Sequence, residues 1–578
     1  IAVFVPVLFI EGLIGNLFKE LAFTVSFSLL ASLFVALTVV PMLASRLLKV
    51  SPKQSEEKRR QGRMLTWLDK ATRWVLGHRL VVIAITLVLL VIGGFGLTTV
   101  GTQFLPATDE GFFTIKIKHE HGTPLNVTEE TVAKIEDVLA DERDIEDYLS
   151  LIGSSSQQGP GSAALENEAE IFVSMIDLDK RDRSTLEISE DLKSQIERAA
   201  GDAEISMSQH GSLGSEPNTL TFFIQADTES NLDDYASQIH EELEDLNGVN
   251  EVVSDRSETQ DEIRITVDRD QALEEGLVPA QVATIVNHVT RGQQASQLTT
   301  EAEEVLAIVV QYDEEVVKDI EALKDLLIKK PDGSYITLGD VTEIERAEGD
   351  VSIQRADQLP AVQFTVKYKS DTTLGDVTAQ VEEKIDELDL PDDFAMSYTG
   401  DQELLQDALD DLALAFILAV IFVYLVMAAQ FESLKYPFVI IFTIPLIVIG
   451  VMIALTVTRT PIGITAIIGL IVLAGIVLNN GIVLVDFINQ LKASGWRTYD
   501  AIIESVKVRA RPIIMTAVTT ILGLIPLSLG IGEGAEIQQP LGITVIGGLI
   551  SSTFLSLFII PIVYSLFDKE TRHLNKKY

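Results

Sequence analysis

The chain contains no cysteine among its 578 residues. It can therefore form no disulfide and hold no metal ion or redox centre through thiolates, on whichever side of a membrane its parts lie. A G-x-x-x-x-G-K-[ST] segment is also missing, which excludes an ATP site of the P-loop kind. A secretory leader is not indicated, because the chain opens at Ile1 in an apolar run with no charged segment before it. A shortened helix fits this start better.

Basic residues are scarce in the central part of the chain. Residues 103–411 hold 72 of the 85 acidic residues but only 22 of the 44 basic ones, a net charge of −50, whereas the other segments together carry +9. The acidic residues are spread evenly, which fits adaptation to a saline medium, and such an excess concerns solubility more than catalysis. An acidic surface also argues against nucleic acid as a partner.

Apolar runs long enough to cross about 30 Å of hydrocarbon as helices flank this acidic block. They cover residues 20–45, 80–100, 412–430, 438–457, 464–488, 512–531 and 540–566, and residues 1–10 resemble the end of one more. The connections 46–79 and 489–511 and the tail after 568 carry ten, five and four Lys or Arg residues, all on one side if each run crosses once. Positive charge marks the cytoplasmic side, so the acidic block is predicted to be external.

The connection 46–79 includes a stretch, Met64–Leu76, in which apolar residues are interspersed with charges. This pattern predicts an interfacial helix that lies on the inner leaflet. A plain basic linker is the alternative.

The two ends of the chain resemble each other. At an offset of 520 residues, eleven of forty ungapped positions from residue 6 to residue 45 are identical, and Pro6 and Pro41 fall on Pro526 and Pro561. The chain is therefore expected to open with the end of one helix bundle and to close with the end of a second, parallel copy. On this interpretation about 400 residues of the first copy precede the sequence.

The acidic block alternates short strands, rich in β-branched or aromatic residues, with amphipathic helices. Strands are predicted at 112–118, 170–176, 219–226 and 361–368, and helices at 127–139, 184–199, 232–246 and 374–388. Paired strand–helix–strand units of this size suggest ferredoxin-like modules. The segment from about 262 to 347 interrupts the second set with its own helix (279–289), a hairpin-like stretch (298–312) and a turn (331–333). We interpret it as an inserted subdomain.

Several local strings give this arrangement a likeness to a known family. They are FLP (104–106) with DEG (109–111), GLVPAQV (276–282), QFES (430–433), GIVLNNGIVLVDF (475–487), and RARP (509–512) with MT (515–516). With these strings in order and at suitable spacing, the whole chain resembles the resistance-nodulation-division (RND) superfamily. The likeness is strongest to its hydrophobe/amphiphile efflux branch, of the acriflavine-resistance type.

The resemblance implies a polytopic α-helical membrane protein with a large external α+β (ferredoxin-like) porter region and an inserted docking subdomain. Its expected parts are the end of a first transmembrane bundle (1–48), a cytoplasmic linker with the interfacial helix (49–79), a span (80–102), a first porter module (103–214), a second porter module in two parts (215–261 and 348–405), the docking subdomain (262–347), a five-span bundle (406–567) and a cytoplasmic tail (568–578).

The family implies a proton-driven exporter of hydrophobic or amphiphilic small molecules in the cytoplasmic membrane, and neither an enzyme nor a cofactor protein. It also implies contact with membrane lipid, a homotrimer, and a periplasmic adaptor with an outer-membrane channel. An RND-like lipid or protein translocation factor, or a receptor that transports little, is the alternative. The inserted segment favours the exporter, because simpler relatives generally lack it. Eight scattered methionines argue against the copper-exporting branch.

Proton coupling in the family rests mainly on two aspartates of its fourth span, which this sequence does not include. Their partners on later spans correspond here to Asn479, Arg509 and Thr516. Related exporters often have lysine at the position of Asn479, so the uncharged asparagine departs from their usual ion pair. Asp486 lies seven residues after Asn479 on the same helical face and is a further candidate. Hydration of Asp486 near the helix end, and anchoring of Arg509 at the inner leaflet, are the simpler alternatives.

For the substrate, Phe112 and Phe172 match positions that line the family's deep pocket, although both fit equally well as core residues of strands. Gly153, Ser154 and Ser156 fall in its switch loop. That loop is often aromatic in drug exporters but reads GSSSQQG here, so a more polar pocket is expected. His119 and His121 share a strand face, yet two histidines alone rarely bind a metal, and no metal site is predicted.

Overall fold

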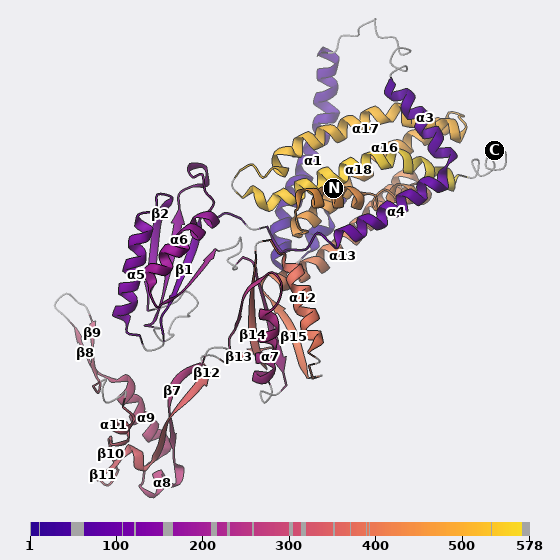
Figure 1. Ribbon diagram of the computed structural model, residues 1–578. Helices are drawn as coiled ribbons and strands as arrows, with labels where there is room; N and C mark the ends of the chain where they lie inside the picture. The colour runs from indigo at the N-terminus through magenta and orange to yellow at the C-terminus, as the bar shows by residue number, and fades with distance from the viewer. Residues whose placement is uncertain are drawn as a thin grey trace. The chain divides into compact units, whose positions relative to one another are not determined.

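The computed structural model describes most of the chain, and the described residues divide into two compact units. The described ranges are 2–10, 12–47, 63–106, 108–120, 123–153, 166–209, 217–227, 232–256, 259–299, 305–313, 319–350, 353–369, 371–388, 390–391, 393–532 and 534–568. The first unit comprises Ile1–Phe223, Gln238–Val252 and Phe364–Tyr578, and the second comprises Ile224–Ser237 and Val253–Gln363. Figure 1 shows the long helices of the first unit and the strands and short helices of the second.

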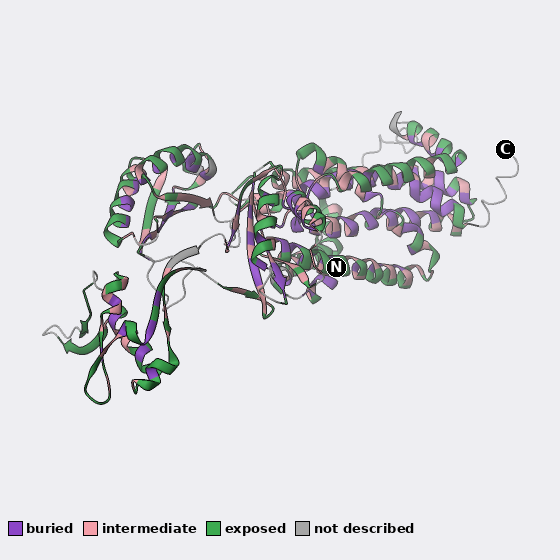
Figure 2. Cartoon of the chain, turned by 60° about the horizontal axis from the view of Figure 1, so that its bottom comes forward, coloured by how far each residue is buried: buried purple, intermediate pink, exposed green. Residues whose placement is uncertain are grey.

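Within the described residues, six helices of the first unit are long and apolar enough to cross a membrane. They are α1 (Gly12–Leu47), α4 (Arg79–Leu97), α13 (Asp401–Phe431), α16 (Ile464–Ala493), α17 (Thr498–Ser528) and α18 (Ala535–Phe567). In the apolar window of each helix, 67% of α18 and 56% of α16 is buried, against 22% of α13 and 0% of α1. The core of this bundle therefore runs along α16 and α18, and buried residues gather inside it in Figure 2.

The short apolar helix α15 (Ile447–Thr458) packs against α18 almost backbone to backbone. A Cβ atom on Gly450 would lie 2.2 Å from the carbonyl oxygen of Gly547, and one on Gly547 would lie 2.3 Å from the Cβ of Ala454. Small residues allow membrane helices to approach this closely, and the close approach adds van der Waals contacts.

The span predicted at 438–457 is interrupted. Helix α14 (Lys435–Ile441) ends before Phe442, and α15 begins at Ile447. Between them the backbone bonds join residues three apart, such as Thr443 N to Ile440 O at 3.0 Å. Pro445 explains the break, because it has no N–H to donate and disfavours helical geometry in the residue before it.

Two helices start earlier than their apolar runs. Helix α17 begins at Thr498, so most of the predicted connection 489–511 is helical and only Ser494–Arg497 joins it to α16. Helix α13 begins at Asp401 with a charged first turn, before the apolar run at 412. Hydropathy detects only the apolar part of a helix. The first turns of α13 and α17 contain charged residues, so the apolar run begins later than the helix in both cases. Residues 6–9 at the start of the chain form a short 3₁₀ helix.

The stretch around Met64–Leu76 is helix α3 (Arg63–Gly77), so the plain-linker alternative is wrong for these residues. Leu68, Thr72, Val75 and Leu76 of α3 are buried, and the helix contacts α17 and α18. Its Asp69 carboxylate lies 2.7 Å from Lys507 Nζ of α17. Burial opposes ionisation of Asp69, but hydrogen bonds from Lys507 and Arg73 outweigh it and lower the pKa.

The first sheet has strand order β2-β3-β1-β4, with every neighbouring pair antiparallel. Its elements are β1 (Phe112–Lys118), α5 (Leu125–Ala140), β2 (Ile145–Ile152), β3 (Glu168–Met175), α6 (Thr185–Ala200) and β4 (Glu204–Gln209). One core cluster joins Phe113, Ile115 and Ile171 of the sheet to Ile135 and Ile188 of the helices. The sequence predicted β1, α5, β3 and α6 but not the edge strands β2 and β4.

A buried ion pair fixes the segment that leads into this sheet. Arg181, whose side chain is 0% exposed, lies 2.6 Å from Asp109 through Nη2 and also donates to the carbonyl oxygens of Ile176 and Arg183. The other oxygen of Asp109 accepts from Thr185 N at 2.9 Å, at the start of α6. Burial raises the pKa of Asp109, but the hydrogen bonds from Arg181 and Thr185 outweigh it and bring the pKa below 3.8.

The second sheet has the order β13-β14-β5-β15, and β6 also pairs with β14. Its elements are β5 (Thr219–Ala226), α7 (Leu232–Glu244), β6 (Val249–Ser254), β13 (Gln354–Ala356), β14 (Leu359–Tyr368), α12 (Leu374–Glu387) and β15 (Phe394–Thr399). The rings of Phe222 and Phe364 stack at 5.3 Å between centroids. The strands predicted at 219–226 and 361–368 are both present.

The long strands β7 (Thr259–Val267) and β12 (Thr342–Asp350) pair antiparallel and enclose the inserted segment. Between them lie α8 (Arg269–Glu274), α9 (Pro279–Arg291), β8 (Gln293–Thr299), β9 (Val305–Val310), α11 (Ile320–Lys324), β10 (Leu327–Lys329) and β11 (Tyr335–Thr337). A separate core cluster includes Leu277, Val282 and Val341. The predicted helix and turn of this segment are present. The hairpin was predicted at 298–312, but its first strand already begins at Gln293.

Candidate functional site

A cavity of about 620 Å³ opens beside α16 and α17 in the first unit. Its polar walls come from Asn479 and Asn480 of α16 and from Thr516 and Thr520 of α17. The remaining lining is apolar and includes Phe4, Val423 and Leu549. The described residues around this cavity thus combine two amides and two hydroxyls in an otherwise apolar setting.

Helix geometry explains why these side chains meet. Gly475, Ile476 and Asn479 lie three and four residues apart on α16 and share one face, as do Thr516 and Thr520 on α17. Gly475 leaves room for the start of the chain, because a Cβ atom there would lie 3.2 Å from the side chain of Val3. Asn480 is 7% exposed, whereas Asn479 and Thr516, which also line the cavity, are exposed.

The two hydroxyls are oriented by their own helix. Thr516 Oγ1 donates to Ile513 O at 2.9 Å, and Thr520 Oγ1 donates to Thr516 O at 3.0 Å. A hydroxyl has one proton, so each oxygen has only lone pairs left for further contacts. The hydroxyl side of the cavity therefore accepts hydrogen bonds, and the amides of Asn479 and Asn480 can donate or accept.

The other two predicted coupling residues lie elsewhere. Asp486 accepts a hydrogen bond from Gln490 Nε2 at 2.6 Å, one turn further along α16. The Arg509 guanidinium lies over the ring of Phe487 at 4.5 Å from the centroid, and its buried Nε has no hydrogen-bond partner among the described residues. The structure thus brings Asn479 and Thr516 to one cavity and places Asp486 and Arg509 outside its lining.

Sequence reasoning missed Asn480 and Thr520. Asn480 stands beside Asn479 in the sequence, yet a one-residue step along a helix turns the side chain by about 100°. Only the packing of the bundle shows that both amides reach the same cavity. Thr520 lies one turn after Thr516, and this spacing was the available signal.

The two candidate substrate phenylalanines occupy one face of the first sheet. Phe172 pairs with Thr114, and Phe112 lies two residues before Thr114 on β1, so both side chains point to the same side. Their neighbours Phe113, Ile171 and Val173 form the core cluster on the opposite side, under α5 and α6. Phe112 is 37% exposed. Neither phenylalanine therefore belongs to that core cluster.

The remaining candidates are described only in part. Gly153 follows β2 with a φ of +75°, a conformation that glycine adopts without strain. Ser154 and Ser156 lie outside the described residues, as does His121. His119 Nε2 lies 3.0 Å from Thr131 Oγ1. Among the residues that the structure describes, no three His, Asp or Glu side chains group in a way that could hold a metal ion.

Comparisons with known proteins cover almost the entire chain. The profile of a family described as the AcrB/AcrD/AcrF family matches residues 1–568. The swarming motility protein SwrC of Bacillus subtilis (strain 168) is 31% identical over 575 residues, which are 98% of this chain and 54% of SwrC.

Two crystal forms of a heavy metal efflux pump share the fold. Their TM-scores are 0.78 and 0.77 at 22% and 23% identity, and the matches cover 98% of this chain but 56% and 57% of theirs. The chain therefore spans about half the length of the relatives that it matches.

Proposed function

This chain belongs to the AcrB/AcrD/AcrF family of RND transporters, and from that membership we propose that it takes part in proton-driven export of hydrophobic or amphiphilic molecules across the cytoplasmic membrane. The cavity at Asn479 and Thr516 carries the proposal. Polar side chains within a membrane bundle are costly, so they usually serve a function. Here four of them surround one cavity between long apolar helices.

In the proposed mechanism, Asn479 and Thr516 are partners of a carboxylate that gains and loses a proton during transport. The described lining of the cavity contains no carboxylate of its own. An ionised carboxylate would accept hydrogen bonds from the amide of Asn479. Once protonated, it would donate to an oxygen such as Thr516 Oγ1, whose own proton is held by Ile513 O. A change of partner of this kind links proton binding to helix movement. We assign Arg509 and Asp486 a supporting electrostatic role outside the cavity.

The external sheets are the proposed substrate region. The first sheet has the strand order of a split β-α-β unit, which supports interpreting 103–214 as a ferredoxin-like porter module. Residues 215–261 with 348–405 would form a second porter module, and 262–347 a docking subdomain. Phe112 and Phe172 offer an aromatic surface on the side of the sheet away from its helices. Gly153, Ser154 and Ser156 are proposed to contribute to the same substrate site. A homotrimer with a periplasmic adaptor and an outer channel completes the proposal.

Export itself is tested with the intact protein in a host that lacks its own exporters. Cells should accumulate less of an amphiphilic dye when they produce the protein, and a protonophore should abolish the difference. Zinc, copper and silver ions are included as separate challenges. Dye accumulation equal to that of the empty host, with improved tolerance of a metal ion, would contradict the proposed substrate class. An effect that persists without a proton gradient would contradict the proposed energy source.

Membrane orientation is tested on the Cys-free chain. Lys70 is exposed on α3, and Glu130 is exposed on α5 of the proposed external block. In intact cells, an impermeant thiol reagent should label Glu130→Cys and should label Lys70→Cys only after the membrane is opened. The opposite pattern would invert the orientation inferred from the Lys and Arg distribution.

A further inference from the structure

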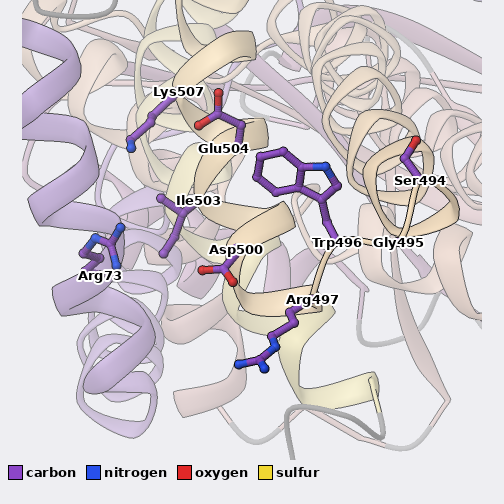
Figure 3. Close-up of a pocket in the computed structure, with 9 residues that line it drawn as sticks. All are labelled: Arg73, Ser494, Gly495, Trp496, Arg497, Asp500, Ile503, Glu504 and Lys507. Atoms are coloured by element: carbon purple, nitrogen blue, oxygen red, sulfur yellow. The ribbon is translucent and has the colours of Figure 1, made fainter.

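A second pocket, of about 520 Å³, lies where α3 meets the turn between α16 and α17. Its walls are Arg73 of α3, Ser494, Gly495, Trp496 and Arg497 of the turn, and Asp500, Ile503, Glu504 and Lys507 of α17. Figure 3 shows the indole of Trp496 in the middle of this group and the guanidinium of Arg497 at its lower edge. This pocket is separate from the cavity at Asn479.

The local sequence builds the pocket. Gly495 has a φ of +89°, which allows the chain to reverse after α16 and sets Trp496 and Arg497 just before α17. Asp500, Ile503, Glu504 and Lys507 are spaced three and four residues apart and share one face of α17. Helix α3 is held to this face by the contact of Asp69 with Lys507 Nζ of α17 at 2.7 Å, and Asp69 also contacts Arg73 Nε of its own helix at 3.1 Å.

The charges of the pocket are mixed. Arg73, Arg497 and Lys507 are positive, and Asp500 and Glu504 are negative. Asp69 already pairs with Arg73 and Lys507. Arg497 is the third positive side chain of the pocket and takes no part in these two ion pairs. A simple anion would be opposed by the two carboxylates, and a simple cation by the arginines. A ligand with a phosphate next to an ammonium group satisfies both signs, because guanidinium binds phosphate and carboxylates accept from ammonium.

The surroundings of the pocket indicate a lipid. Trp67 and Trp74 of α3 and Trp496 are 59%, 53% and 46% exposed, and tryptophan favours the boundary between lipid and water. From the pocket, a stripe of exposed apolar side chains continues along α17. The stripe consists of Val508, Met515, Val518 and Leu522, which are 43%, 59%, 47% and 61% exposed. These positions follow Glu504 at helical spacing and share their helix face with the exposed Arg511, so acyl chains could lie along them below a head group in the pocket.

We propose that this pocket binds the zwitterionic head group of an aminophospholipid of the phosphatidylethanolamine type, with its acyl chains along α17. Arg497 would hold the phosphate, Asp500 and Glu504 the ammonium group, and Trp496 would cover the glycerol region. The bound lipid would fill the space between α3 and α17 and so stabilise their contact.

Native mass spectrometry of the intact protein in detergent provides the test. The protein is titrated with phosphatidylethanolamine, phosphatidylglycerol and phosphatidylcholine of the same acyl chains, and separately with soluble phosphoethanolamine. Phosphatidylethanolamine should bind most tightly. Arg497→Gln and Asp500→Asn should each weaken its binding on the order of tenfold, the effect of losing one charge-assisted contact.

Matched controls separate the pocket from general charge effects. Arg459→Gln at the end of α15 and Glu536→Gln at the start of α18 remove the same charges outside the pocket and the stripe, and they should leave the affinity unchanged. Equal or tighter binding of phosphatidylglycerol, or no response to Asp500→Asn, would overturn the zwitterionic assignment. Phosphoethanolamine binding as tightly as the lipid would overturn the lipid assignment in favour of a soluble ligand. Equal weakening by the control variants would refute the site.

Discussion

Replacing Asn479 by leucine is expected to slow export roughly ten- to hundredfold while expression, assembly and substrate binding stay intact. Asn479 is an exposed residue of the cavity lining, so its amide can donate to a carboxylate. Leucine keeps a similar shape but makes no hydrogen bond. A hydrogen bond to a charged group contributes about 1.5–3 kcal/mol, and each 1.4 kcal/mol changes a rate about tenfold. Without this hydrogen bond the pKa of the carboxylate rises, so the decrease in export rate should vary with external pH.

Two companion variants sharpen this test. Asn479→Lys should retain more export than Asn479→Leu, because lysine can also donate to a carboxylate. Thr516→Val should slow export, whereas Thr519→Val should not, since Thr519 lies on the same helix outside the cavity lining and donates to Met515 O. Initial rates of dye efflux from vesicles with an imposed proton gradient would measure each variant. If Asn479→Leu exports at the parent rate across the pH range, Asn479 has only a packing role and the proposed coupling role is wrong.

Asp109→Ala is expected to destabilise the first sheet module by about 3–5 kcal/mol, the usual effect of leaving a buried charge without its partner. Arg181 has a side chain that is 0% exposed, and Asp109 is its carboxylate partner at 2.6 Å. The substitution also removes the acceptor of Thr185 N at the start of α6. Limited proteolysis at increasing urea, read at sites within 103–214, would measure the loss.

The same pair predicts a pH dependence. Because the folded protein lowers the pKa of Asp109, its ionised form stabilises the fold fully above the unfolded value near 3.8, and this contribution disappears as the pH falls through the lower folded value. Asp177→Ala is the control, since Asp177 pairs with Lys180 at the surface, where the two side chains are 58% and 63% exposed. A double variant with leucine at both Asp109 and Arg181 should regain much of the stability. Equal losses for Asp109→Ala and Asp177→Ala would refute the argument.

The strands and helices of the external block could be predicted wherever burial of one face gives the sequence a periodic pattern of apolar residues. In β1, alternate residues face the core and the open side of the sheet, and the predicted range 112–118 equals the observed one. The edge strands β2 and β4 were missed. In β2, only one neighbour covers the strand and most side chains are at least partly exposed, so its composition is less apolar.

The membrane part shows the limit of hydropathy. The average over 438–457 indicated one span and hid the break around Pro445, because a single proline hardly changes a mean over about twenty residues. Both Asn479 and Asn480 line the same cavity because of the way α16 packs, and the sequence spacing alone does not predict this. Arg509 was predicted, like Asn479, as a partner of carboxylates on another span, and in this structure its guanidinium lies over the ring of Phe487. Only tertiary packing decides between such neighbours.

The glycine contact between α15 and α18 has a mechanical consequence. Gly450 and Gly547 bring the two backbones so close that no side chain separates them, and even one added methyl group would collide. Two helices with no layer of side chains between them resist sliding and tilting relative to each other, so α15 and α18 are expected to move as one rigid unit. Helix α13, which is only 22% buried in its apolar window, has no such constraint within the described chain. Within the described residues, a movement of α13 relative to the α15–α18 pair is therefore expected to require less energy than a separation of α15 from α18.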